Sequence, residues 1–251
     1  MEKRAERIAA WLRERANEAG ARGFILGMSG GVDSAVVARL CQLAMPGQVL
    51  GVIMPCHSHA EDELDAVLAA EACKLPTVRV DLSASYDALA MDITAVTAAE
   101  RGHGFAPDPL RTKLALANIK PRLRMTTLYT IGTSLGFLVT GTGNRSEIAI
   151  GYYTKYGDGG VDLLPIGALV KSEVRALARE LGVPPRLIDK PPSAGLWAGQ
   201  TDESEMGFTY EDLEKYLESG PESVAAETAA RIRHLMNTSA HKRELPPVAP
   251  K

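Results

Sequence analysis

An apolar run that ends in a glycine-serine turn and leads straight into a helical pattern constrains this chain more than any other stretch. Residues 24–28 are mostly apolar, residues 29–31 read Ser-Gly-Gly, and from Val32 onward apolar residues recur at helical spacing. This order is typical of a buried strand, a tight turn and a helix that packs on the sheet. Gly30 and Gly31 allow the backbone to turn sharply and to approach a ligand closely. The stretch therefore predicts a strand-turn-helix unit of a parallel α/β sheet.

The start of that predicted helix is suited to bind phosphate. Its first N–H groups have no partner within the helix, and the helix dipole favours an anion there. Ser29 and Ser34 add hydroxyl groups, and Asp33 adds a carboxylate that can hold a hard cation. The turn lacks the lysine of a Walker A loop and does not match the dinucleotide fingerprint G-x-G-x-x-G. The structural alternative is a capped turn in which Asp33 and Ser34 only satisfy helix N–H groups.

Length and composition favour one large α/β domain over residues 1–251, because such a chain can bury a substantial core. The net charge of −3 gives no support to a role in binding nucleic acid or a membrane surface. No apolar run approaches membrane-spanning length and the N-terminus does not resemble a signal peptide, so we expect a cytoplasmic protein. Cys41, Cys56 and Cys73 form no CxxC pair. We expect them to be buried small side chains rather than zinc or redox ligands.

Further apolar runs at residues 48–54, 77–82 and 136–140 predict three more strands, with helical patterns between them. The β-α-β-α-β order implies a Rossmann-like, doubly wound parallel sheet with helices on both faces. Because ligands bind beyond the carboxyl ends of such strands, we expect adenine to lie near Met54. Helical patterns are expected at residues 32–43, 61–74, 86–100, 114–135, 171–181, 210–217 and 224–237. Pro121 is expected to kink or split the fourth of them.

Two loops are rich in glycine and proline, Arg101–Pro109 and Lys190–Gly207. Neither has the apolar content to hold itself against the core, so we expect both to be mobile when the sites are empty. His103 in the first loop is interpreted as a solvated loop histidine without a role.

The run Ser-Gly-Gly-Val-Asp-Ser resembles the PP-loop of the ATP pyrophosphatases, which holds the pyrophosphate of ATP while the α-phosphate is attacked. Four further blocks, at residues 118–125, 141–147, 153–162 and 190–203, occur in an order and spacing similar to the NAD synthetases. Those enzymes amidate the nicotinic-acid carboxylate of deamido-NAD in the last step of NAD biosynthesis. The resemblance covers nearly the whole chain, with the PP-loop at 27–34 and a C-terminal tail from about residue 238.

The resemblance implies sites for ATP and for Mg²⁺. Contacts to ATP would come from Gly27, Met28, Ser29, Gly30, Gly31, Val32, Asp33, Ser34, Thr142, Lys171 and Ser193. Asp33 and Glu147 would hold Mg²⁺. Two carboxylates are sufficient because phosphates supply the other oxygen ligands of the ion. For Glu147 the alternative is an acid favoured by the dipole in the first turn of a helix. Lys171 stands at a helix start, where acids are usually preferred. Pointing at phosphate, it would offset charge in the transition state, whereas the alternative is a solvated lysine. Asp33 and Lys171 are the catalytic candidates.

The resemblance also implies a site for deamido-NAD. Its contacts would come from Arg122, Lys155, Asp158, Asp162, His241 and Lys242. A guanidinium group suits phosphate, as expected of Arg122. A simple Gly/Asp turn is the alternative for residues 155–162, and a basic tail is the alternative for the last two residues. Arg124 is a candidate for a structural ion pair.

The implied reaction is attack of the nicotinate carboxylate on ATP, which gives an NAD-adenylate and pyrophosphate. Ammonia then displaces AMP. An amidotransferase domain would not share 251 residues with this one, so free ammonia is the expected donor, and a separate glutaminase subunit stays open. A homodimer formed through Leu114–Leu135 is implied as well. The alternatives are another PP-loop ligase, such as part of GMP synthetase or a tRNA-modifying enzyme, and an ATP-binding sensor of universal-stress-protein type. No basic face or catalytic cysteine supports the tRNA enzyme.

Overall fold

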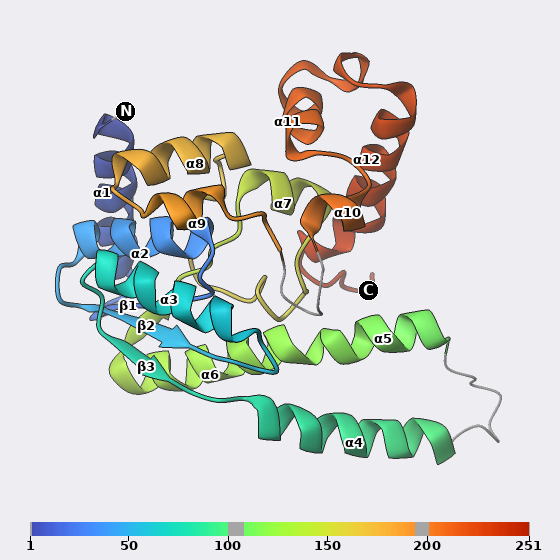
Figure 1. Cartoon of the computed structure of the whole chain (residues 1–251), viewed down its shortest axis with the longest axis horizontal. Coiled ribbons are helices and arrows are strands. Elements are labelled where there is room, and N and C mark those ends of the chain that lie inside the picture. The colour runs from blue at the N-terminus through green and yellow to red at the C-terminus, as the bar shows by residue number, and fades with distance from the viewer. Residues whose placement is uncertain (1, 100–107, 194–200, 251) are drawn as a thin grey trace.

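The computed structural model describes residues 2–99, 108–193 and 201–250 (Figure 1). Its sheet has the strand order β3-β2-β1-β4, and every pair is parallel. The strands are β1 (Gly23–Gly27), β2 (Val49–Ile53), β3 (Thr77–Arg79) and β4 (Phe137–Val139). The chain runs outward from β1 to β2 and β3, then returns to the other side of β1 for β4. This doubly wound, Rossmann-like arrangement confirms the predicted fold class.

Helices cover both faces of the sheet because β1 is apolar on both sides (Figure 1). Phe24 and Leu26 point into one core, and Ile25 points into another. The first core is closed by α1 (Glu2–Glu18), α2 (Val32–Ala44), α3 (Ala60–Ala72), α8 (Lys171–Glu180) and α9 (Pro185–Asp189). The second core is closed by α6 (Ile119–Leu135), which supplies Leu128. The central strand is therefore buried from both faces, as its continuous apolar run predicted.

The helices α4 (Ser83–Ala99) and α5 (Pro109–Ala117) project beyond the sheet as neighbours (Figure 1). The helix predicted over residues 114–135 is divided, as expected, but the break between α5 and α6 lies at Asn118 rather than at Pro121. Pro121 stands in the first turn of α6, where its missing N–H costs no intrahelical bond. Most of the predicted loop 101–109 lies outside the described residues, while Asp108 caps α5 by accepting from Leu110 N at 2.9 Å.

A third cluster of buried side chains lies beneath the C-terminal helices. It includes Ile150, Met206, Leu213 and Ile232. The helices are α7 (Arg145–Ile150), α10 (Asp202–Met206), α11 (Tyr210–Ser219) and α12 (Ala226–Thr238), with short 3₁₀ turns η2 (Pro221–Ser223) and η3 (Ala240–Lys242). Helix α10 falls within a stretch expected to be loop, and the preceding residues 194–200 lie outside the described part. The predicted mobility of both loops stays a prediction.

Two expectations about the chain as a whole can be compared with the structure. Among the described helices, none is long and apolar enough to cross a lipid bilayer. All three cysteines are free and buried, as predicted. Burial raises the pKa of Cys41 to about 12 and that of Cys73 to about 11, and it also raises the pKa of Cys56.

Candidate active site

The candidate site lies where the direction of winding reverses, at the carboxyl ends of β1 and β4. These strands are neighbours, yet β1 leads into α2 and β4 leads into α7. The turns that follow such strands open a crevice at the edge of the sheet, which is where ligands bind in doubly wound folds. The PP-loop and the second glycine-rich turn meet at this edge of the sheet, where Asn144 Nδ2 donates to Asp33 Oδ1.

Hydroxyl groups hold the PP-loop in shape. Gly31 N donates to Ser29 Oγ at 3.3 Å, and Ser34 Oγ donates to Gly31 O at 3.0 Å. The two hydroxyl oxygens lie 3.2 Å apart. Helix α2 begins at Val32 after a glycine N-cap, which carries no side chain to accept from the first N–H groups. These groups remain suited to an anion.

Two carboxylates and one lysine converge beside the loop. Asp33 comes from the first turn of α2, Glu147 from the first turn of α7, and Lys171 from the start of α8. Lys171 Nζ is ion-paired with Asp33 Oδ2 and lies 3.6 Å from Glu147 Oε1. The lysine side chain is 3% exposed, whereas the two carboxylates are 17% and 18% exposed. The structure thus brings together three side chains that lie in three distant parts of the sequence.

Asn144 connects the two carboxylates, a role that sequence reasoning missed. Its Nδ2 donates to Asp33 Oδ1 at 3.1 Å, and its Oδ1 accepts from Glu147 N at 3.0 Å. Glu147 Oε2 in turn accepts from Asn144 N at 3.2 Å. This reciprocal pattern is a capping box, and the Asn-x-x-Glu spacing could have revealed it in the sequence. The cap fixes the Glu147 side chain at the start of α7 and so holds it facing Asp33.

The charges in this cluster depend on one another. Burial disfavours the charged form of Lys171, but Asp33 and Glu147 outweigh that effect and raise its pKa. Desolvation raises the pKa of Glu147, and Asp33 adds to this rise while Lys171 opposes it. The crevice therefore favours a positive charge between its two carboxylates.

Four of the residues proposed for the dinucleotide gather around residues 151–156. Arg122 Nη2 donates to Lys155 O at 3.4 Å, and Lys155 Nζ donates to the carbonyl oxygen of His241. Lys242 Nζ donates to the carbonyl oxygens of Gly151 and Tyr153, both at 2.6 Å. The C-terminal segment therefore docks onto this turn and does not behave as a free basic tail.

Asp158 and Asp162, the two acids of this turn proposed for the dinucleotide, accept hydrogen bonds from other groups of the protein. Asp158 Oδ1 accepts from Thr154 N at 2.9 Å. Asp162 accepts from the Tyr129 hydroxyl at 2.9 Å and from Val139 N at 2.8 Å. Both acids thus support the turn, as in the Gly/Asp alternative. A contact of either carboxylate with deamido-NAD stays a prediction.

Comparison with known proteins identifies the group to which this architecture belongs. The family model for NAD synthase matches residues 4–246. The chain belongs to the NAD synthase family. It is 52% identical over 247 residues to the NH(3)-dependent NAD(+) synthetase of Carboxydothermus hydrogenoformans. The match covers 98% of this chain and 97% of that relative.

Two solved structures of NAD synthase relatives match almost the whole chain. The NMN synthetase from Francisella tularensis has a TM-score of 0.89 and 34% sequence identity, and the match covers 99% of this chain and 98% of that one. The NH3-dependent NAD synthetase from Campylobacter jejuni has a TM-score of 0.79 and 28% identity, with the same coverage. The family identity agrees with the resemblance seen in the sequence.

The remaining predicted positions of this NAD synthase family member lie around the crevice. Thr142 is half-buried in the turn after β4, and Ser193 is exposed just before the undescribed residues 194–200. Met54 lies beside the PP-loop, with its Cε 3.2 Å from where a Cβ on Gly27 would stand. Arg124 donates to Met54 O at 3.2 Å and so binds the backbone after β2, and it forms no ion pair among the described residues. The contacts of Thr142 and Ser193 with ATP, and the place of adenine near Met54, stay predictions.

Two further side chains beside Lys171 were missed in the sequence. Its Nζ lies 5.3 Å from the centre of the Tyr210 ring, and the Tyr210 hydroxyl donates to Asp202 Oδ2 at 2.8 Å. Both residues are 4% exposed. Burial, with nearby carboxylates, raises the pKa of Tyr210, so its hydroxyl remains a donor. Asp202 is one of three acids in residues 202–205 and no pattern distinguishes it from the others, so only the fold reveals this pair.

Proposed function

We propose that this chain catalyses the ATP-dependent amidation of deamido-NAD by ammonia, which yields NAD, AMP and pyrophosphate. The observation that carries the proposal is Lys171 held between Asp33 and Glu147 beside the PP-loop. A protein that only binds nucleotide needs no such group, whereas a departing pyrophosphate needs a cation near its developing charge. Residues 1–251 act as one unit in this reaction.

The first step forms the NAD-adenylate. A carboxylate oxygen of the nicotinate ring attacks the α-phosphorus of ATP, and the bond from that phosphorus to pyrophosphate breaks. The N–H groups at the start of α2 hold the departing phosphates, and Lys171 lies where it offsets their charge. Asp33, fixed by Asn144, keeps the lysine in place.

The second step is attack of ammonia on the acyl carbon. A C–N bond forms, the C–O bond to AMP breaks, and its electron pair leaves with the phosphate of AMP. The adenylate is already reactive, so the protein contributes mainly position and charge. We assign no protein nucleophile to this step.

Asp33 and Glu147 fit a Mg²⁺ ion, because both carboxylates already point at one cation. The described residues contain no group of three or more side chains able to hold a metal ion. Phosphate oxygens and water would therefore supply the other ligands, as is usual for Mg²⁺. When bound there, the ion would neutralise charge on the phosphates. A chelator should accordingly abolish turnover without unfolding the chain.

The direct test is to incubate the chain with ATP, Mg²⁺, ammonium and deamido-NAD and to follow NAD and AMP. Equal amounts of both products are expected. Lys171→Met should lose about a hundredfold or more in kcat while the chain stays folded. A folded wild-type chain that makes no NAD would refute the proposal.

A mononucleotide substrate is the second candidate, because the Francisella structure that matches with a TM-score of 0.89 is named an NMN synthetase. The corresponding acid, nicotinate mononucleotide, carries the same carboxylate but lacks the adenosine half. Parallel assays with both acids at equal concentration decide between them. A higher kcat/KM for deamido-NAD supports the first proposal, and a higher value for the mononucleotide supports the second.

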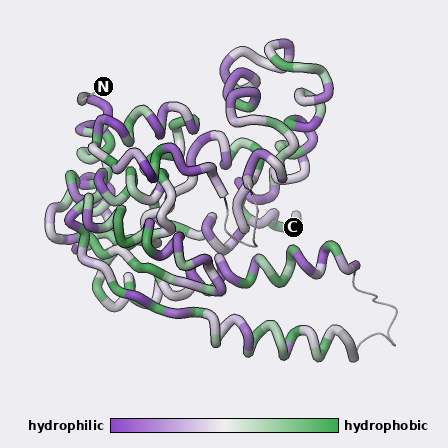
Figure 2. The backbone as a smooth tube through the Cα atoms, viewed as in Figure 1, coloured by the Kyte–Doolittle hydropathy of each residue, from purple (hydrophilic) through white to green (hydrophobic). Residues whose placement is uncertain are grey.

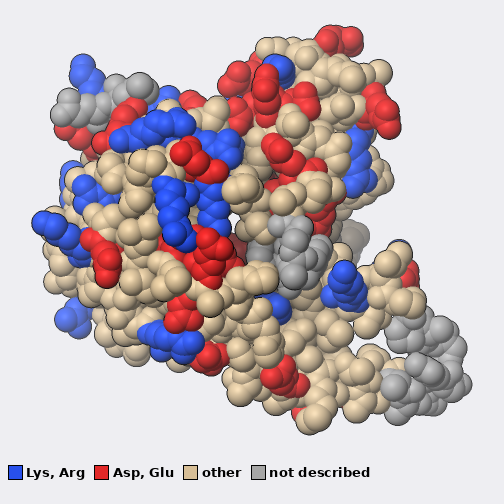
Figure 3. Space-filling model, viewed as in Figure 1, with Lys and Arg blue, Asp and Glu red and all other residues tan. Residues whose placement is uncertain are grey.

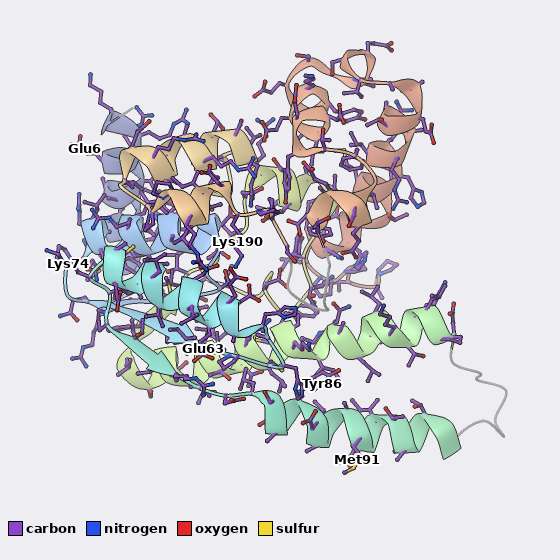
Figure 4. The ribbon with its side chains drawn as sticks, in the orientation of Figure 1. Glu6, Glu63, Lys74, Tyr86, Met91 and Lys190 are labelled. Carbon is purple, nitrogen blue, oxygen red and sulfur yellow. The ribbon has the colours of Figure 1, made fainter. Side chains whose placement is uncertain are left out.

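A cytoplasmic homodimer completes the proposal. The predicted contact surface, Leu114–Leu135, adjoins exposed apolar side chains on the projecting helices. Leu110 is 81% exposed and Met91 is 67% exposed. Helix α4 carries hydrophobic residues along its length, and Met91 points away from the rest of the molecule (Figures 2 and 4). Light scattering should give twice the monomer mass, and Met91→Glu should shift it toward the monomer. A wild-type monomer at working concentration would contradict this part.

A further inference from the structure

Asp202 is a buried acid, and one of its oxygens has no donor among the residues that the structure describes. The residue is 4% exposed, and its Oδ2 accepts from the Tyr210 hydroxyl at 2.8 Å. Its Oδ1 is buried and has no hydrogen-bond partner in the described part of the chain. The Tyr152 hydroxyl lies within hydrogen-bonding reach of Asp202 as well, and it donates to Glu205 Oε2 at 2.8 Å. A buried carboxylate oxygen in this state is unfavourable unless a ligand supplies the missing donor.

Asp202 lies near Lys171 but does not belong to the group of residues proposed to hold the phosphates. Tyr210 is close to both groups, because its ring centre lies 5.3 Å from Lys171 Nζ and its hydroxyl donates to Asp202 Oδ2. On its other side, Asp202 N donates to Pro192 O at 3.1 Å, which ties the start of α10 to the residue before Ser193. Asp202 thus lies near the cluster of Lys171, Asp33 and Glu147 and is bound to the Tyr210 hydroxyl.

A cavity lies beside Tyr152 and Glu205, the hydrogen-bonded pair next to this acid. It has a volume of about 250 Å³ and lies between α7, α10 and α12, with Tyr152 and Glu205 in its wall. Two cations also line it, but Arg231 donates to Met206 O at 3.2 Å and Lys242 donates to backbone carbonyls. Asp202 does not line the cavity, whereas Tyr152, which interacts with Asp202, does. A small polar molecule has room to reach this pair.

We propose that Asp202 binds the ammonium ion that supplies nitrogen to the reaction, with Tyr210 and Tyr152 as its aromatic walls. An ammonium ion offers four N–H donors, a full positive charge and a size close to water. One donor would satisfy Asp202 Oδ1, and the aromatic faces favour a desolvated cation. The inference rests on the proposed function, since it names the binding site of one of its substrates.

The chemistry balances with Asp202 in a binding role alone. The bound ion loses one proton to water before its nitrogen can attack, and it loses a second after the C–N bond has formed. Ammonium and adenylate thus give NAD, AMP and two protons. Adenylate formation requires no ammonium, so the two half-reactions can be measured separately.

The test is Asp202→Asn, which keeps the shape of the side chain and removes its charge. With saturating ATP and deamido-NAD, the KM for ammonium should rise by about tenfold or more. The KM values for ATP and deamido-NAD, and the exchange of pyrophosphate into ATP that depends on deamido-NAD, should change less than about twofold. Glu211→Gln is the matched control, because it removes a carboxylate that is 77% exposed and next to Tyr210. Its KM for ammonium should equal the wild-type value.

Each outcome decides one question. Absence of pyrophosphate exchange in the folded wild-type chain defeats the proposed function. Normal exchange with an unchanged KM for ammonium in Asp202→Asn defeats this inference alone. If that variant does not fold, Tyr210→Phe keeps the ring and removes only the hydrogen bond to the acid. An unchanged KM for ammonium in Tyr210→Phe then overturns the inference, and a raised value with intact exchange supports it.

Discussion

Replacement of Gly30 by alanine tests how closely the PP-loop approaches α3. Gly30 has a φ of +77°, a conformation that side chains with a Cβ rarely adopt. An added Cβ would stand 2.7 Å from Asp62 O, 2.8 Å from Asp65 Cβ and 2.9 Å from Ala66 N. All three atoms belong to one helix and two are backbone, so a flexible side chain cannot move aside to make room.

Helix α3 is also held from the other side. Asp65 is 2% exposed and accepts from Arg186 Nε at 2.8 Å and from Lys190 Nζ at 2.7 Å. Positive and negative side chains stand together over α3 and α9, and Lys190 lies between these helices (Figures 3 and 4). The left-handed backbone costs about 1 kcal/mol for alanine, and forced overlap in a packed region costs about 1–3 kcal/mol. We therefore expect Gly30→Ala to lower the unfolding free energy by about 2–4 kcal/mol.

Two glycines provide matched controls in chemical denaturation. Gly47 has a φ of +75° and nothing within 4 Å of an added Cβ, so Gly47→Ala should show the backbone cost alone, about 1 kcal/mol. For Gly31, which has a negative φ, the nearest atom is Ser29 Oγ at 3.4 Å, and Gly31→Ala should be nearly as stable as wild type. Pyrophosphate exchange should fall furthest in Gly30→Ala because its loop is displaced. Equal losses of stability in Gly30→Ala and Gly47→Ala would refute the close approach.

The other predictions concern buried charge and buried thiols. Lys171→Met should lower the unfolding free energy by about 2 kcal/mol in denaturant titrations, less than for a fully buried pair because its carboxylates retain some solvent. Lys215→Met, which breaks an exposed ion pair, should have no measurable effect. The pKa of Lys171 is raised in the folded state. The difference in unfolding free energy between wild type and Lys171→Met should therefore be complete below pH about 10, and it should shrink as the pH rises through the folded-state pKa of Lys171. None of the three cysteines should react with a thiol reagent at neutral pH until denaturant is added, because burial raises their pKa values. Rapid labelling of the native chain by the thiol reagent would contradict the cysteine prediction. A difference in unfolding free energy that stays constant above pH about 11 would contradict the Lys171 prediction.

The sequence predicted the parts of the fold that carry a strong local pattern. Strand β1 is buried on both faces, so it stands out as a continuous apolar run, and the long helices show clear periodicity. The five-residue helices α9 and α10 are too short for a period to register. The break at Asn118 was misplaced because a proline in the first turn of a helix is tolerated. Local patterns therefore fail where a boundary depends on how neighbouring segments pack.

In the candidate site, too, some residues follow from a local sequence pattern and others only from the packing of distant segments. Asp33, Glu147 and Lys171 each stand at the start of a helix after a recognisable block, so residue type and position were sufficient to select them. Asp202 lies within the matched block 190–203, but residue type did not single out Asp202 or Tyr210, because their importance comes from burial beside one another. A buried acid is marked by its surroundings, and those surroundings come from segments distant in the sequence.

Placing the positive charge on a separate helix has a physical consequence. A Walker A lysine belongs to the phosphate loop itself, whereas Lys171 reaches the loop from α8. Helix α8 holds its position by burying Val174 and Leu177 in the same core that α2 fills with Val36. The distance between Lys171 and the PP-loop therefore depends on side-chain packing some turns away from the chemistry. Close-packed cores transmit changes of a single methylene, so a cavity beneath α8 should weaken catalysis even with every residue of the site intact.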